Sequence, residues 1–131
     1  MALTNLEVVS VPVSDQERAK QFYVDKLGFA VQLDGTFGEN MRWVMLRPPG
    51  SGTSITLVNW FETMPAGSLK GSVLSCDDLD KTLAELASRG VNFSEAEVQE
   101  APWGRWKTLE DPDGNSWIVQ ENNPDFSDGS R

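Results

Sequence analysis

The chain has 131 residues, with 20 acidic and 11 basic side chains, a net charge of -9 and no histidine. The length fits one domain or two small units that share a core. The negative charge argues against nucleic acid or an anionic membrane surface as a partner, since both recruit clustered Lys and Arg. Without histidine the chain cannot build a Ser-His-Asp or Cys-His catalytic set, or a metal site based on imidazole.

The first half of the chain predicts a strand, a helix and three further strands. Ser14 is expected to cap the helix, because Glu17 follows three residues later as in a capping box. Gly28 suits the left-handed residue that ends such a helix. The apolar stripe of the helix comprises Ala19, Phe22, Tyr23 and Leu27, so Tyr23 is expected to pack rather than react. Strands are predicted at residues 6–13, 29–34, 42–47 and 54–60, and a loop at residues 35–40.

The second half repeats this order of elements. Asp77 or Asp78 is expected to cap a helix that ends at Gly90. The buried stripe of this helix comprises Leu79, Leu83 and Leu86. Strands are predicted at residues 69–76, 92–97, 105–110 and 115–121, and a tight turn at residues 111–114 joins the last two.

The two halves form a repeat, because Asp15 and Asp77 are separated by the same 62 residues as Gly28 and Gly90. We therefore predict an α+β fold of two βαβββ modules in tandem, whose curved mixed sheet surrounds a shared cleft. The predicted boundaries are residues 1–61 for the first module, 62–68 for a connector, 69–122 for the second module and 123–131 for a mobile tail.

Several short motifs resemble the vicinal oxygen chelate superfamily, which includes glyoxalases, extradiol dioxygenases, and fosfomycin and bleomycin resistance proteins. Val-Ser-Asp at 13–15, Phe-Tyr at 22–23 and Leu-Gly-Phe at 27–29 look like its opening module. Asp-Pro-Asp-Gly-Asn at 111–115 is similar to the turn before its last strand, and Pro-Trp-Gly-Arg at 102–105 to a glyoxalase-like bacterial subgroup. The resemblance covers about residues 5–122 and implies the fold predicted above.

The resemblance also implies where a metal would be held. Metal-binding members place ligands on the first, fourth, fifth and eighth strands, and the matching positions here are Val8, Thr56, Gly71 and Ile118. Three of these side chains cannot coordinate a cation, and Thr56 offers one weak neutral oxygen. Only Glu7, Gln120 and Glu121 lie near enough to substitute if the alignment shifts. We therefore expect no metal and no cofactor.

The favoured hypothesis is a module that binds a small hydrophobic or planar molecule in the cleft. Five tryptophans supply flat apolar surface for such a ligand, although Trp117 is expected in the core. Arg42 and Arg105 could each hold an anionic substituent of the ligand, although a surface ion pair is the favoured interpretation of both. The full set of predicted ligand-binding residues is Ser10, Arg42, Trp43, Thr56, Val58, Trp60, Val73, Trp103, Arg105, Ile118 and Gln120.

Two enzymatic alternatives stay open. The first is a metal-independent isomerase or lyase in which Glu121 or Glu100 transfers the proton. The second is a metal-dependent glyoxalase-like lyase or dioxygenase with unusual ligands. The resemblance further implies a homodimer. A cytoplasmic location is expected, since no apolar run approaches the roughly 18 residues of a membrane span and residues 1–5 lack the features of a signal peptide.

The lone cysteine, Cys76, cannot form an internal disulfide. Its neighbours Asp77 and Asp78 are expected to raise the pKa of the thiol, because their negative charge disfavours the thiolate. The sequence therefore predicts that Cys76 packs as a small, unreactive side chain.

Overall fold

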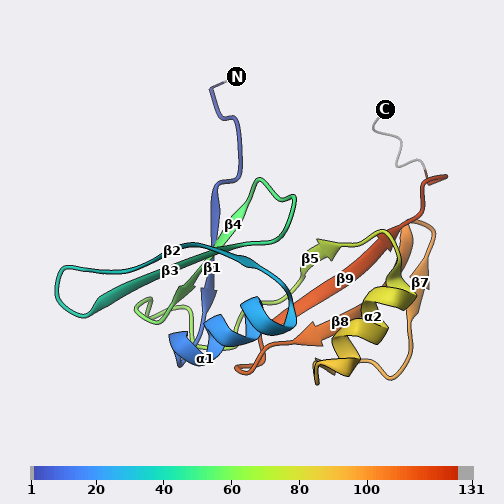
Figure 1. Cartoon of the computed structure of the whole chain (residues 1–131). Helices are drawn as coiled ribbons and strands as arrows, with labels where there is room; N and C mark the ends of the chain where they lie inside the picture. Colours follow the sequence, from blue (N-terminus) through green and yellow to red (C-terminus); the bar gives the residue numbers. More distant parts are fainter. Residues whose placement is uncertain (1, 127–131) are drawn as a thin grey trace. The chain divides into compact units, whose positions relative to one another are not determined.

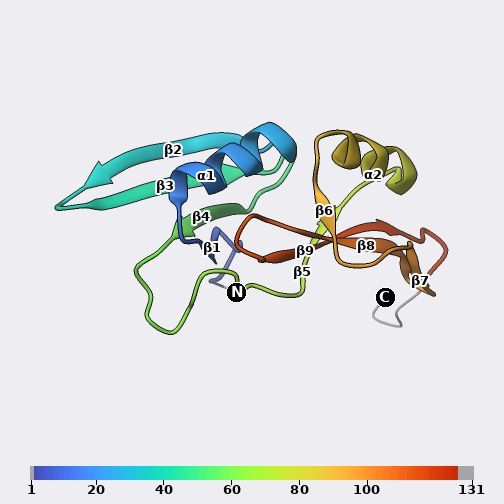
Figure 2. The same ribbon diagram turned by 90° about the horizontal axis from the view of Figure 1, so that it is seen from below.

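The structure is a computed structural model that describes residues 2–126. It contains two compact units, shown from two directions in Figures 1 and 2. The first unit comprises the chain up to Leu69 together with Asp111–Asn115, and the second comprises Lys70–Glu110 with the chain from Ser116 onward. Within residues 2–126, no helix is long and apolar enough to cross a bilayer. Part of the predicted tail, residues 127–131, lies outside the described residues.

The first unit follows the order strand, helix, strand, strand, strand. Its sheet has the strand order β1-β4-β3-β2, in which β1 runs parallel to β4 and the other neighbours are antiparallel. The helical segment lies against one face of this sheet. The elements are β1 (Val8–Pro12), α1 (Gln16–Gln21), η1 (Phe22–Lys26), β2 (Ala30–Phe37), β3 (Met41–Arg47) and β4 (Ser54–Val58).

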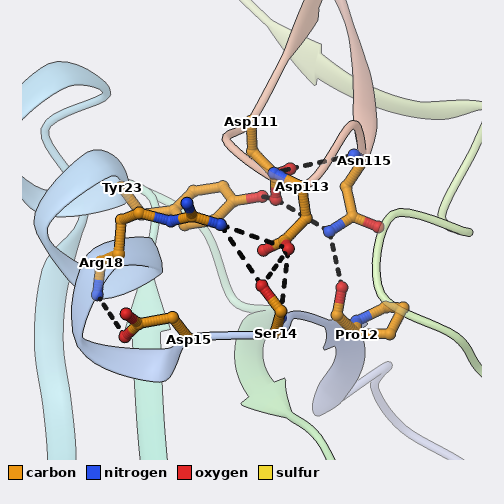
Figure 3. Close-up of polar contacts among 8 residues, drawn as sticks. All are labelled: Pro12, Ser14, Asp15, Arg18, Tyr23, Asp111, Asp113 and Asn115. Atoms are coloured by element: carbon orange, nitrogen blue, oxygen red, sulfur yellow. Dashed lines mark hydrogen bonds and ion pairs between the residues drawn. The ribbon is translucent and has the colours of Figure 1, made fainter.

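The helical segment begins one residue later than predicted. The Asp15 carboxylate, and not the Ser14 hydroxyl, accepts the capping hydrogen bond, from the backbone N–H of Arg18 at 3.0 Å. The Ser14 hydroxyl instead donates to Asp113 at 2.5 Å and accepts from the Arg18 guanidinium at 3.3 Å (Figure 3). The helix then widens into the π-helical turn η1, which the sequence analysis did not anticipate. It ends at Gly28, as predicted, with φ +77°.

The predicted loop at residues 35–40 is too long, because β2 continues through Phe37 and pairs with β3 as far as Met41, which leaves only residues 38–40 outside the strands. Gly38 and Asn40, with φ +67° and +64°, instead make a tight turn. The glycine at position 35 weakened the expectation of a strand, but the cross-strand partner Trp43 holds it in the ladder. The β2–β3 hairpin therefore extends beyond β1 and β4 (Figure 1).

The second unit repeats the order with one additional short strand. Its sheet has the order β5-β9-β8-β6, with β5 parallel to β9, and β7 also pairs with β8. Helix α2 is capped by the Asp78 carboxylate and ends next to Gly90, in agreement with the prediction. The elements are β5 (Ser72–Ser75), α2 (Leu79–Ser88), β6 (Asn92–Phe93), β7 (Gln99–Ala101), β8 (Gly104–Glu110) and β9 (Ser116–Asn122).

The predicted strand at residues 92–97 is reduced to the two residues of β6. The cause is Glu95, whose carboxylate accepts hydrogen bonds from the backbone N–H and the hydroxyl of Thr108 at 2.7 and 2.8 Å. The Glu95 carboxylate thus takes the place of a backbone carbonyl as the partner of the Thr108 N–H in β8, and β6 ends at Phe93. β7, which the sequence analysis missed, then pairs with the other end of β8.

Each unit has its own apolar core beneath its helix. In the first unit, Tyr23, Val11 and Leu57 have no exposed surface. In the second, Trp117 is 4% exposed, which confirms its predicted place in the core. The remaining fully or nearly buried apolar side chains are Val13, Ala19, Phe22, Phe29, Val44, Leu46, Ile55 and Val58 in the first unit and Leu79, Leu86, Val91, Leu109 and Val119 in the second.

The turn Asp111–Asn115 belongs to the first unit, although it connects two strands of the second. Figure 3 shows how it is held. The Tyr23 hydroxyl donates to Asp111 at 2.7 Å, and the Asn115 amide donates to the Pro12 carbonyl at 2.8 Å. Asp113 accepts from the Ser14 hydroxyl. This sequence motif therefore has a structural role, and Tyr23 packs as predicted.

Candidate functional site

The two faces of the first sheet differ in what covers them. Alternation along β1, β3 and β4 places Val11, Leu46 and Leu57 on the face against the helical segment. The residues between them lie on the opposite face, which we call the helix-free face. These residues include the predicted ligand-binding positions Ser10, Trp43, Thr56 and Val58, so four of the predictions fall on one surface.

Polar groups occupy the middle of this helix-free face. Ser10 on β1 pairs with Thr56 on β4, and Thr56 pairs in turn with Met45 on β3. Val8, two residues before Ser10, pairs with Ser54. Thr56 and Val58 are only 2% and 1% exposed, so their side chains are almost completely covered. Ser10 and Met45 are half-buried and border it.

An aromatic cluster of Trp43, Trp60 and Phe61 lies at one end of this face. The ring centroids of Trp43 and Trp60 are 5.2 Å apart, and those of Trp60 and Phe61 are 6.1 Å apart. Both tryptophans are half-buried and Phe61 is 47% exposed. The cluster therefore offers aromatic surface that the first unit does not fully cover, which is the kind of surface that binds planar molecules.

The second sheet has its own helix-free face. Val73 pairs with Ile118, and Gln120 pairs with Trp106, on the side away from α2. The indole of Trp103 stacks on that of Trp106 with centroids 5.9 Å apart and planes 10° apart. Val73 and Trp103 are 49% and 46% exposed. The structure thus brings four predicted residues of the second module, Val73, Trp103, Ile118 and Gln120, onto one face of its sheet, whereas Arg105 lies on the other face.

Arg42 lies on the opposite face of the first sheet, next to α1. Its guanidinium donates two hydrogen bonds to Asp34, at 2.9 and 2.8 Å, and one to Glu17 at 2.9 Å. The hydrogen bond with Arg42, and then that with Lys20, holds the pKa of Asp34 well below its ordinary value. The same hydrogen bonds raise the pKa of Arg42. The charge of Arg42 is therefore already compensated, as in the ion-pair alternative.

Arg105 is similarly surrounded in the second unit. It contacts Asp80 at 3.1 Å, Glu100 at 3.5 Å and Glu121 at 3.7 Å. Glu121 also accepts a 3.0 Å hydrogen bond from the backbone N–H of Leu79, the first residue of α2. Both predicted catalytic carboxylates therefore engage the same guanidinium. They line a pocket of about 310 Å³ formed by Glu100, Ala101, Gly104, Arg105, Glu121, Asn122, Asn123 and Pro124.

The positions that match the family's metal ligands do not supply a metal-binding donor set. Val8 and Thr56 lie on the helix-free face of the first sheet, and Ile118 lies on that of the second. Gly71 precedes β5 and has φ +83°, a conformation that favours glycine. Among residues 2–126, no group of three Cys, Asp or Glu side chains could hold a metal ion. The residues present do not fit a Zn, Ni or Fe centre.

Cys76 is half-buried just after β5. Burial raises the pKa of its thiol, and the negative charges of Glu121, Asp77 and Asp78 add to this effect. A hydrogen bond with Thr82 acts in the opposite direction. The direction agrees with the sequence prediction, although burial contributes more than the neighbouring aspartates.

The predicted site residues omit two polar residues of the helix-free face, Arg47 and Ser54. Arg47, at the end of β3, shares the alternation of Trp43 and Met45, and its Nε donates to the Ser54 hydroxyl at 3.0 Å. The signal that could have identified it was its spacing of four residues from Trp43 in one predicted strand. Arg42 differs from Trp43 by one residue, so it points to the other face.

Two βαβββ units in tandem, each with a helix-free sheet face, define the glyoxalase-like class of fold. Residues 5–119 match the Glyoxalase/Bleomycin resistance protein/Dioxygenase superfamily, and the chain belongs to that superfamily. Its fold is similar to that of TnmS3, described as an antibiotic binding protein from Streptomyces sp. CB03234, at 44% identity and a TM-score of 0.86 over 94% of this chain and 99% of that one.

Two further proteins extend the comparison. A superfamily member from Sphaerobacter thermophilus DSM 20745 has 34% identity and a TM-score of 0.84 over 92% of this chain and 99% of that one. The "Uncharacterized protein YetH" of Bacillus subtilis is 29% identical over 91% of this chain and 99% of its own length. These similarities extend over nearly the whole chain and are not confined to one of its two units.

Proposed function

We propose that this protein binds a small, planar and largely apolar molecule on the helix-free face of its first sheet. The observation that carries the proposal is the aromatic cluster of Trp43, Trp60 and Phe61, which shares the helix-free face with the half-buried side chain of Ser10. Exposed ring surface supplies contact area for a flat ligand, and a few polar groups beside it orient that ligand. The described resemblance to an antibiotic binding protein supports an antibiotic-like ligand.

Binding without chemical change is favoured over catalysis by the state of the carboxylates. Glu100 and Glu121, the two candidate proton-transfer groups, both engage Arg105 on the helix-covered side of the second sheet. Both carboxylates therefore already have a cationic partner in the protein. Neither glutamate lies in the first unit, where the aromatic cluster is.

We also propose that binding needs no metal. Val8, Gly71 and Ile118 carry no donor atoms on their side chains, so a cation at the family's usual position would have the Thr56 hydroxyl as its one side-chain ligand. The test is incubation with excess Ni²⁺, Zn²⁺, Mn²⁺ or Fe²⁺, followed by desalting and elemental analysis. Less than a tenth of an equivalent should remain per chain. One retained equivalent would overturn the metal-free proposal.

The ligand-binding proposal is tested with a flat compound and a non-flat control. Anthracene-2-carboxamide should quench tryptophan fluorescence saturably and raise the melting temperature. Its fully hydrogenated analogue has similar hydrophobicity but no flat ring, and should do neither. Replacing Trp43 with Leu should weaken binding of the aromatic compound about five-fold, because a stacked ring contributes about 1 kcal/mol beyond its buried area. Equal binding of both compounds would contradict the proposal.

We further propose that the protein acts as a homodimer. The β2–β3 hairpin exposes Leu33, Phe37 and Met41 by 38%, 52% and 37% on the helix-free face, and apolar surface of this kind is typical of protein interfaces. Sedimentation equilibrium should give a mass of about twice 14.5 kDa. A mass of one chain at micromolar concentration would contradict the dimer.

A further inference from the structure

We propose that Arg47 recognises an anionic group on the ligand, so that the molecule bound to the first sheet is a planar aromatic acid. This inference rests on the proposed function, and adds to it the chemical class of the ligand and the residue that selects it. It comes from the position of Arg47, from its hydrogen bonding and from the lack of a compensating charge.

Arg47 is held in a fixed place on the helix-free face. It is the last residue of β3, two positions from Met45 and four from Trp43, so all three side chains lie on one side of the strand. Its Nε donates to the Ser54 hydroxyl at 3.0 Å, and Ser54 has no exposed surface. This hydrogen bond orients the guanidinium plane and leaves the terminal N–H groups for another acceptor.

The charge of Arg47 is not compensated by the protein. Among residues 2–126, its one side-chain hydrogen bond is to Ser54, and it forms no ion pair with a carboxylate. Arg42 and Arg105, in contrast, contact two and three carboxylates. In a chain of net charge -9, a half-buried arginine without an acidic partner keeps its charge available for a ligand.

The surroundings of Arg47 favour a carboxylate-like group over water. The neighbouring positions on the same face are Val8, Ala30 and Met45, which are apolar and offer no competing acceptor. A guanidinium presents two parallel N–H groups to a planar anion, and such a pair strengthens where apolar side chains reduce contact with water.

The spacing also defines the size of the ligand. Four residues along an extended strand separate Arg47 from Trp43, which is roughly 13 Å between their Cα atoms. A molecule of two or three fused rings with an acidic group at one end spans this distance. Its rings would lie on the aromatic cluster and its acidic group would reach the guanidinium.

The test compares anthracene-2-carboxylate with the isosteric anthracene-2-carboxamide at pH 7.5, by fluorescence titration of the full-length protein. Wild type should bind the carboxylate about ten-fold more tightly, the effect of one charge-assisted pair. Arg47→Met should remove this preference while retaining binding of the carboxamide. Lys81→Met changes the net charge equally on the exposed surface of α2, and should keep the preference.

Arg47→Lys serves as a second variant, since it keeps the positive charge and should retain part of the preference. Circular dichroism establishes that each variant is folded. If wild type binds both compounds equally, or if Arg47→Met keeps the preference, the Arg47 inference is overturned while the proposed function stands. If neither compound binds to wild type, the proposed function itself is overturned, and the inference with it.

Discussion

The hydroxyl of Tyr23 donates a 2.7 Å hydrogen bond to Oδ2 of Asp111, a residue 88 positions later in the chain. Asp111 is 5% exposed and its other oxygen accepts from the backbone N–H groups of Asp113 and Asn115. One buried carboxylate therefore both organises the turn Asp111–Asn115 and attaches it to the helical segment of the first unit. Two chain segments that are distant in sequence depend on this residue.

Removing either partner of this hydrogen bond should destabilise the protein. We expect Tyr23→Phe and Asp111→Asn each to lower the free energy of unfolding by about 1–3 kcal/mol, since a buried polar group loses its partner. Urea denaturation monitored by tryptophan fluorescence provides the measurement. Glu62→Gln is the control, because Glu62 is exposed and makes no hydrogen bond or ion pair among residues 2–126. Equal stabilities of Asp111→Asn and Glu62→Gln would refute the structural role of Asp111.

Gly67 lies against the same turn and should not tolerate a side chain. Its φ is +84°, and a Cβ atom there would collide with the backbone carbonyl of Asp113. Gly50 also has a positive φ, +76°, but nothing lies within 4 Å of its Cβ position. Gly50→Ala should therefore cost about 1 kcal/mol, the penalty of the left-handed conformation alone. Gly67→Ala should cost clearly more in the same denaturation assay, and a similar loss for both variants would exclude the collision.

Acid should weaken the pairing of Asp34 with Arg42 and Lys20. The pKa of Asp34 in the folded state lies below its ordinary value of 3.8, so the ionised carboxylate stabilises the fold above that pH. This contribution, about 1 kcal/mol for a partly exposed network, disappears as the pH falls from 3.8 toward the lowered pKa.

The Asp34 contribution is measured by urea denaturation at a series of pH values. Asp34→Asn should be less stable than wild type at pH 6, and the difference should shrink at pH 2. Asp25→Asn is the matched control, since Asp25 is exposed and makes no side-chain interaction with a described residue. A constant difference between wild type and Asp34→Asn across this range would contradict the assignment.

Much of the fold could be predicted because its signals are local. Glycines 28 and 90 end their helices, as the sequence predicted, since a left-handed residue at that position depends on the immediate chain. The short β6 could not be predicted, because it depends on Glu95 contacting Thr108 across thirteen residues. Ser14 failed as a cap for the same reason: its hydroxyl has a partner, Asp113, that no local rule reveals.

The sequence correctly predicted the sheet face of a site residue where alternation along a single strand decides it. It did not do so where the face depends on how neighbouring strands pair. Ser10 and Thr56 could be assigned to one face, because each follows from its place in a single strand. Arg42 and Arg47 lie in the same predicted strand, but which of them faces the helix depends on pairing with β2 and β4. The carboxylates that compensate Arg42 come from α1 and β2, so composition alone could not separate it from Arg47.

Burial and neighbouring negative charges both raise the pKa of the Cys76 thiol, and the rate of its alkylation distinguishes the two causes. If burial dominates, as the structure indicates, Cys76 should react with iodoacetamide much more slowly than the same thiol in the urea-unfolded chain at pH 8.0. The rate in the folded protein should change little in 0.5 M NaCl or in Asp77→Asn, because salt screens charges and leaves burial unchanged. Mass spectrometry of the alkylated chain gives both rates. A several-fold acceleration by salt would instead assign the shift to Asp77, Asp78 and Glu121, which is the cause that the sequence alone suggested.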